Sequence, residues 1–162
     1  MSNDQSTAAE TDAERYIRET LFANGRNPSG SLPERMGVRF HAVSAERLVA
    51  TMPVAGNTQP YGLLHGGASV VLAESLGSLG ATLHAGPGRV AAGLEVSATH
   101  HRSVTSGQVT GTATAIRLGR SVATYEVVIT DEANRRVCTS RVTCLVRPAP
   151  PADRPAPPNE AG

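Results

Sequence analysis

A single long apolar segment limits the folds open to this chain more than any other feature of its sequence. The segment begins near Leu64 and reads "LHGGASVVLAESLGSLGATLHA". On a helical wheel at ~100° per residue, its leucines fall within one narrow stripe, which predicts an amphipathic helix packed on a sheet. The stripe consists of Leu72, Leu76, Leu79 and Leu83.

Alternating apolar and polar residues predict strands on both sides of this helix. Residues 38–54 are typical of a hairpin with its turn near "SAE". Three or four more strands follow the helix, roughly at Val90–His100, Gln108–Leu118, Ser121–Thr130 and Arg135–Arg147. The turns at Gly119-Arg120 and at "DEAN" are short enough for antiparallel hairpins. The order predicts an α+β domain with one antiparallel meander and one dominant helix.

Composition divides the chain into three parts. Residues 1–34 are predicted to be an N-terminal tail with a short helix, which begins at a capping box of Thr11 and Glu14 and stops at Gly25. Residues 26–37 are typical of a loop, and residues 35–147 form the folded domain. The proline-rich residues 148–162 are predicted to be a disordered tail.

Charge and cysteine content exclude several classes of protein. The net charge is +1, without the basic patch that nucleic-acid binding or an anionic membrane surface requires. The acidic start lacks the basic and apolar regions of a secretory signal, and no apolar run is long enough to span a membrane. Cys138 and Cys144 stand about 20 Å apart in one predicted strand, too far for a disulfide. We expect a cytoplasmic protein with two free, buried thiols.

Glu74 is out of place in so apolar a helix. It points about 200° away from Leu72 on the wheel, and its neighbours on that face are small: Gly67, Ser78, Ala81 and Ala85. Small residues along a second face indicate a second packing partner, for which another subunit is the natural candidate. Glu74 is then a partly desolvated carboxylate and a functional candidate. The alternative is a glutamate that reaches solvent or pairs with an arginine across the interface.

The helix start suggests what Glu74 does. Gly66 and Gly67 let another group approach the backbone closely, and the first N–H groups of a helix lack internal partners. These donors can form an oxyanion hole for a carbonyl that becomes negative during acyl transfer. An ordinary tight turn is the alternative. With Glu74 two turns along, one rigid helix would supply both the electrophile stabiliser and the base.

The segment "GLLHGGASVVLAESLGS" resembles the signature helix of hotdog-fold acyl-CoA thioesterases, in the branch with the phenylacetate-pathway and 4-hydroxybenzoyl-CoA enzymes. The resemblance continues through "AAGLEVSATHHRSVTSGQVTGTATAIRLGRS" and "VCTSRVTCLV" and covers about residues 35–147. Within the branch the chain is most similar to thioesterases for 1,4-dihydroxy-2-naphthoyl-CoA in menaquinone synthesis. A sister group clears misprimed aryl carrier protein. The implied fold is a hotdog: one antiparallel sheet wrapped around a long central helix.

The resemblance also implies roles for individual residues. The implied catalytic set is Glu74 as base or nucleophile, the Gly66 amide and His65 at the thioester carbonyl, Gln59 at the thioester or its water, and Ser78 as the hydroxyl that orients the water. The implied substrate and CoA contacts are His100, Arg102, Arg120 and Ser121. His101 departs from the family, where an apolar residue is frequent at this position.

The implied reaction is hydrolysis of an aromatic acyl-CoA to the free acid and CoA, by a homodimer or a homotetramer with active sites between subunits. Glu74 would either take a proton from water or attack the carbonyl to form an anhydride. Alternative substrates are medium-chain or long-chain acyl-CoAs and misacylated carrier protein. A non-catalytic acyl-CoA-binding protein and a hotdog dehydratase are alternatives of other classes. No pair of histidines or acids has a recurring zinc-ligand spacing, so we expect no metal and no cofactor.

Overall fold

The computed structural model describes residues 9–21 and 30–150 of the chain. In chain order the elements are α1 (Asp12–Leu21), α2 (Leu32–Arg35), β1 (Arg39–Val43), β2 (Arg47–Pro53), α3 (Gly66–Ala85), β3 (Arg89–His100), β4 (Gln108–Leu118), β5 (Val122–Thr130) and β6 (Arg136–Pro148). The predicted strands and the predicted long helix are therefore present, with boundaries that differ by one or two residues.

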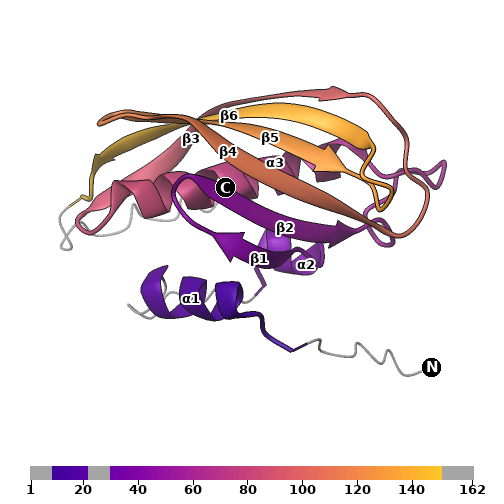
Figure 1. Cartoon of the computed structure of the whole chain (residues 1–162), viewed down its shortest axis with the longest axis horizontal. Helices are drawn as coiled ribbons and strands as arrows, with labels where there is room; N and C mark the ends of the chain where they lie inside the picture. Colours follow the sequence, from indigo (N-terminus) through magenta and orange to yellow (C-terminus); the bar gives the residue numbers. More distant parts are fainter. Residues whose placement is uncertain (1–8, 22–29, 151–162) are drawn as a thin grey trace, which may run out of the picture.

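One antiparallel sheet of six strands curves around α3, so the predicted α+β fold is confirmed (Figure 1). The strand order is β1-β2-β4-β5-β6-β3. The predicted meander holds for β4, β5 and β6 but is wrong for β3, which pairs with β6 at the far edge instead of with β4. A connection that spans the width of the sheet leaves no mark in local periodicity, because pairing order depends on tertiary contacts.

Helix α3 lies unusually deep against the sheet, in contact with β2, β4, β5, β6 and β3. Leu72 and Leu76 are fully buried, as the leucine stripe predicts. Two helix glycines allow the close approach. A Cβ on Gly77 would come within 2.7 Å of the Val142 side chain, and one on Gly80 within 2.8 Å of Tyr125. The sheet thus contacts helix residues beside the leucine stripe as well as the stripe itself.

Only some of the small residues on the second face of α3 are exposed to solvent. Ala81 and Ala85 belong to the core of this one chain, so the expectation that they await another subunit is wrong. The curvature of the sheet explains the error, since a wheel assumes a flat surface on one side. Glu74 and Gly67 are exposed and Ser78 is half-buried, which narrows the open face to the strip around these residues.

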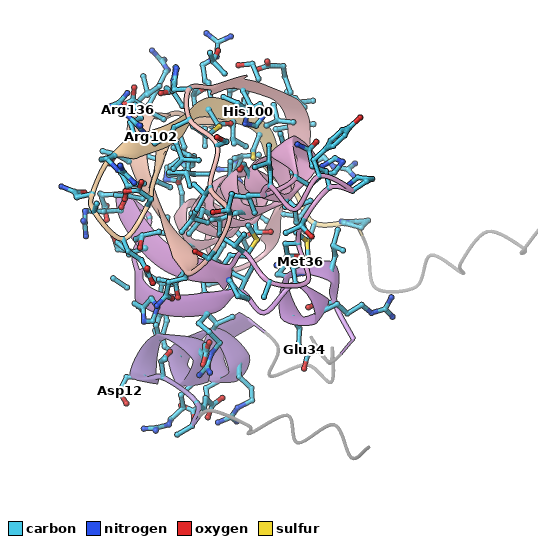
Figure 2. All side chains as sticks on the ribbon, turned by 90° about the vertical axis from the view of Figure 1, so that its right-hand side faces the viewer. Asp12, Glu34, Met36, His100, Arg102 and Arg136 are labelled. Atoms are coloured by element: carbon cyan, nitrogen blue, oxygen red, sulfur yellow. The ribbon has the colours of Figure 1, made fainter. Side chains whose placement is uncertain are left out.

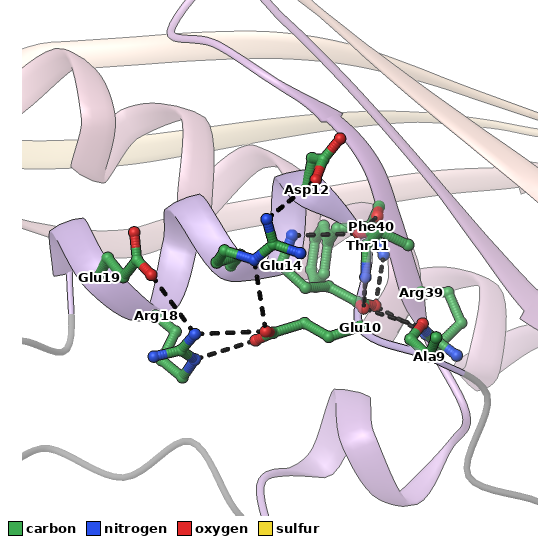
Figure 3. A network of polar contacts seen from close by, with 10 residues as sticks. Ala9, Glu10, Thr11, Asp12, Glu14, Arg18, Glu19, Arg39 and Phe40 are labelled. Atoms are coloured by element: carbon green, nitrogen blue, oxygen red, sulfur yellow. Dashed lines mark hydrogen bonds and ion pairs between the residues drawn. The ribbon is translucent and has the colours of Figure 1, made fainter.

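The capping box predicted for α1 is confirmed and also ties α1 to the sheet (Figure 3). The Glu14 N–H donates to Thr11 Oγ1 at 3.1 Å, and the Thr11 N–H donates to the Glu14 carboxylate at 2.9 Å. Glu14 also accepts from Arg39 Nε at 2.7 Å and from the Phe40 N–H at 3.2 Å. The Thr11 hydroxyl donates to the Phe40 carbonyl. The same two side chains therefore start the helix and bind β1.

The predicted loop at residues 26–37 contains one correction, the single turn of α2. Pro33 lies in its first turn, where a missing N–H costs nothing. The predicted stop at Gly25 lies outside the described residues, as do residues 1–8 and 22–29 of the predicted N-terminal tail and residues 151–162 of the predicted C-terminal tail. Within the described part of the chain, no helix is long and apolar enough to cross a membrane.

Candidate active site

The start of α3 is organised by the side chain of His65, which is the N-cap residue of the helix. Its Nδ1 accepts a hydrogen bond from the Gly67 N–H at 2.8 Å. Because an imidazole nitrogen that accepts cannot carry the proton, this bond assigns the neutral ring's proton to Nε2. The exposed His65 ring therefore presents an N–H donor beside the helix start.

The Gly66 N–H remains available. No hydrogen bond within residues 9–21 and 30–150 uses it, because it is the first donor of the helix and has no internal acceptor. Gly66 lines a cavity of about 440 Å³, within the usual size range for small-molecule sites. The cavity walls are Gln59, Leu63, Leu64, Gly66, Ser69, His100, His101, Arg102, Ser103 and Val137.

The loop that places Gln59 in this cavity is held by backbone and amide bonds. Asn57 is buried, and its Nδ2 donates to the Met36 carbonyl at 2.8 Å and to the Pro53 carbonyl at 2.9 Å. The Gln59 N–H donates to the Leu63 carbonyl at 2.8 Å, which closes the turn before the helix. Gln59 is thus fixed beside Gly66 by its own loop.

The end of β3 brings His100 to the same place. A Cβ on Gly66 would lie 2.9 Å from His100 Nε2, so the absence of a side chain at Gly66 makes room for the ring. The N–H groups of His101 and Arg102 both point at the Val137 carbonyl, at 2.8 and 3.3 Å. Figure 2 shows His100 and Arg102 in the same part of the molecule as Arg136 and away from Asp12. This end of the cavity is cationic.

Glu74 does not line that cavity. Gly66 and Glu74 are eight residues apart, which is about 12 Å along a helix axis. The Glu74 carboxylate lies instead against β3, where a Cβ on Gly93 would be 3.2 Å from Glu74 Oε1. It is exposed in the single chain, so the expected desolvation is not met there. The idea that one helix presents both groups to one carbonyl is therefore wrong within a single chain.

Ser78 lies one turn beyond Glu74 and close to Cys144 of β6. Ser75 and Thr82, its neighbours along the helix, each donate to the carbonyl four residues earlier, at 2.7 and 2.8 Å. Ser78 instead interacts with the Cys144 thiol. Burial raises the pKa of that thiol, while the Ser78 hydroxyl acts in the opposite direction. Cys144 is therefore a protonated, buried thiol at neutral pH, as Cys138 is, and both are free.

Arg120 and Ser121 lie at the other end of the molecule. The Arg89 guanidinium donates to the Arg120 carbonyl, which places the turn beside the first residue of β3. The cavity is beside His100, the last residue of the same strand. Eleven strand steps separate these ends, or about 36 Å. One chain therefore does not bring Arg120 and Ser121 to the cavity.

Sequence reasoning missed several cavity residues. Ser69 is 1% exposed and lies three residues before Leu72, on the buried side of α3. A hydroxyl within the leucine stripe could have marked Ser69 as a candidate site residue. Val137 and Leu63 could not be found in this way, because nothing local marks an apolar residue as a cavity wall. No group of three acids, histidines or cysteines among the described residues could hold a metal ion.

Comparison with known proteins assigns these features to a family. Residues 61–138, which contain α3 and the end of β3, match the model of the "Thioesterase superfamily". The proofreading thioesterase EntH of Cronobacter turicensis is 46% identical over 128 residues, 78% of this chain and 93% of that relative. A thioesterase structure from Haemophilus influenzae matches with a TM-score of 0.74 at 39% identity, over 78% of this chain and 90% of that one. A mutant thioesterase from Pseudomonas aeruginosa matches with a TM-score of 0.75 at 39% identity, over 90% of this chain and 98% of that one.

Proposed function

The chain belongs to the thioesterase superfamily and is a thioester hydrolase, and on that premise we propose that it hydrolyses aromatic acyl-CoA esters. The acyl group would be 1,4-dihydroxy-2-naphthoyl or a related aryl group, and the products the free acid and CoA. The site would include Glu74, Gly66, His65, Gln59 and Ser78.

The observation that supports this proposal most directly is the unused Gly66 N–H at the wall of a cavity. A preorganised backbone donor at a helix N-terminus stabilises an oxygen that becomes negative in the transition state. The Nε2–H of His65 is a second donor at the same helix start. Gln59 and His100 line the cavity around Gly66, where a thioester carbonyl would be bound.

The reaction needs a nucleophile within about 3–3.5 Å of that carbonyl. In one route Glu74 takes a proton from water, and the hydroxide oxygen bonds to the carbonyl carbon. The C–S bond then breaks, and the thiolate takes its proton from Glu74. In the other route the carboxylate itself attacks, which expels the thiolate and leaves an anhydride that water opens. Ser78 would orient the water in either route.

Because Glu74 lies outside the Gly66 cavity of its own chain, we assign the two groups of each site to different subunits. β3 is an edge strand of 12 residues, and no described segment covers its outer side. Long open edge strands favour pairing with another chain. An antiparallel pair of β3 strands across a two-fold axis would bring the middle of one α3 toward the start of the other. The assembly would be a homodimer or a homotetramer.

The same pairing would complete the CoA site. It brings the Arg89 end of one β3 beside the His100 end of the other, so that Arg120 and Ser121 of one subunit approach His100 and Arg102 of its partner. Arginine guanidinium groups bind phosphate with directed hydrogen bonds. The CoA phosphates would thus be held by residues from both subunits.

A second candidate substrate is a misacylated carrier protein. It is favoured by the 46% identity, over 128 residues, to the proofreading thioesterase EntH of Cronobacter turicensis. The chemistry at Gly66 and Glu74 would be the same, and only the group that carries the thioester would differ. Arg102 and His101 at the exposed end of the cavity would then face an acidic protein surface rather than CoA.

The test is thiol release from a panel of thioesters: 1,4-dihydroxy-2-naphthoyl-CoA, benzoyl-CoA, phenylacetyl-CoA, hexanoyl-CoA, palmitoyl-CoA and benzoylated carrier protein. We expect aryl-CoA esters to react fastest, and Glu74→Gln to lose roughly 10²-fold or more in kcat, as expected for a lost base or nucleophile. Faster release from alkyl-CoA or from carrier protein would replace the aryl-CoA proposal. An unaffected Glu74→Gln enzyme would remove Glu74 from the mechanism.

A further inference from the structure

Glu74 lies over the one point of β3 where the strand has no side chain. A Cβ on Gly93 would be only 3.2 Å from Glu74 Oε1, closer than most real Cβ contacts. The glutamate is two turns into α3, and β3 passes beside it at the edge of the sheet. The place of the carboxylate therefore depends on the bare Cα of Gly93.

The strand is also irregular there. Gly93 pairs with Cys144 and Glu95 pairs with Thr143, so the register shifts by one residue between them. This is the only shift in the pairing of β3 with β6. Bulges occur frequently beside active sites, because they redirect the backbone locally. Cys144, opposite Gly93, is the residue that Ser78 contacts. The bulge thus lies where both proposed catalytic side chains of α3 meet the sheet.

We propose that Gly93 is a positioning residue for Glu74, whose carboxylate occupies the space that any other residue's Cβ would restrict. This inference rests on the proposed function, because it gives Glu74 a place from which to act. A side chain at Gly93 would push Oε1 away by a few tenths of an ångström or turn the carboxylate. A productive catalytic geometry is held within about 0.5 Å and 10–20°, so a shift of this size uses up much of that tolerance and a turned carboxylate exceeds it.

A substitution at Gly93 should not damage the fold. Its φ angle is outside the left-handed region, so alanine adopts the same backbone without strain. Alanine also has less conformational freedom in the unfolded chain, which favours folding at a compatible position. The only atom that must move is the far end of a flexible side chain. The substitution therefore separates stability from activity.

The experiment compares the full-length wild type with Gly93→Ala and with the control Ala92→Ser, using the aryl-CoA that the wild type hydrolyses fastest. Ala92 is exposed and pairs with Leu145, so it faces away from α3 and Cys144. We expect Gly93→Ala to lower kcat about tenfold with KM changed less than twofold, as for a misplaced catalytic group. Its melting temperature should equal or exceed that of the wild type. Ala92→Ser should match the wild type in kcat, in KM and in melting temperature.

A double variant tests whether the effect passes through Glu74. Aspartate is shorter by one methylene, so its carboxylate would no longer reach the added methyl group. In a Glu74→Asp background, Gly93→Ala should therefore lower kcat less than twofold. An equal loss in both backgrounds, or an unchanged kcat in Gly93→Ala, would overturn the role of Gly93. A wild type that releases no thiol would instead overturn the proposed function.

Discussion

His65 combines a structural bond and a proposed catalytic one in a single side chain. Its Nδ1 caps α3 through the Gly67 N–H, and that bond leaves the proton on Nε2 at the start of the helix. Capping fixes the ring and so fixes the direction of the second donor. A histidine is suited to this position because serine or asparagine can cap but offers no second donor in the same place.

Replacing His65 should separate these two roles. His65→Ala removes the cap and should lower the free energy of unfolding by about 1 kcal/mol, whereas His65→Asn keeps a capping acceptor and should cost much less. Both variants lose the Nε2–H, so both should lose roughly 10- to 100-fold in kcat. Urea denaturation followed by circular dichroism and thiol-release kinetics measure the two effects. Full activity in His65→Asn would show that capping alone matters.

Individual candidate residues could be proposed from the sequence where local chemistry marks them. A carboxylate in a leucine-rich helix marked Glu74, and the His-Gly-Gly start marked the Gly66 amide. The sequence did not show that Gly66 lines the cavity of a single chain whereas Glu74 lies outside it. That depends on the wall of the cavity, which residues such as Val137 and Ser103 complete from distant segments. Gly93 was equally hidden, because a glycine in a strand does not reveal what lies above it.

The two edges of the sheet differ in what covers them. At β1, the cap of α1 satisfies the outward N–H and carbonyl of Phe40 through Glu14 and Thr11. At the opposite edge, no described part of the chain binds the outward backbone groups of β3. Covering one edge prevents unwanted strand pairing there and leaves the other edge as the place for a specific partner. Helix α1 would thus contribute to the choice of the proposed interface without lying in it.

The contact of α1 with β1 should depend on pH. Partial burial alone would raise the pKa of Glu14, but hydrogen bonds from Arg39, Thr11 and Phe40 hold it below its ordinary value of 4.5. A lowered pKa stabilises the fold at any pH above that ordinary value, and the contribution is lost as the pH falls through the pKa of the folded state. Glu14→Gln should therefore lower the free energy of unfolding by roughly 1–2 kcal/mol at pH 7, and this difference should shrink as the pH falls below 4.5 and through the lowered pKa of the folded state.

Urea denaturation at several pH values, with amide exchange at Phe40, measures this contact. The matched control is Glu19→Gln on the same helix, because Glu19 is exposed and, among the described residues, its carboxylate pairs only with Arg18, at 3.5 Å. Equal losses in both variants, or a loss in Glu14→Gln that does not shrink as the pH falls below 4.5, would contradict the assigned role of Glu14.

Elements with a clear period were predicted well, and their arrangement was not. The capping box of α1, the hairpin of β1 and β2 and the boundaries of β4 follow from residues adjacent in sequence. The position of β3 beside β6 follows from contacts between segments about fifty residues apart, such as Gly93 with Cys144. No turn chemistry announces such a pairing, so a local reading placed β3 next to β4.

At the scale of the whole molecule, one chain contains every proposed catalytic group but does not bring them together. Gly66, Gln59 and His100 surround one cavity, while Glu74 and Ser78 lie farther along α3. Arg120 and Ser121 lie at the opposite end of β3. Each of these separations would be removed by a second copy paired along β3. The proposed assembly is therefore part of the active site and not only a means of stability.

Mixing two inactive variants tests this central claim most directly. Glu74→Gln and Gln59→Ala chains are unfolded together, refolded at equal concentration, and measured for aryl-CoA hydrolysis beside each variant alone. If each site combines Gln59 of one subunit with Glu74 of another, half the dimers are mixed and each has one intact site. The mixture should then recover about a quarter of wild-type activity. A mixture no more active than the mean of its two parents would contradict the shared site.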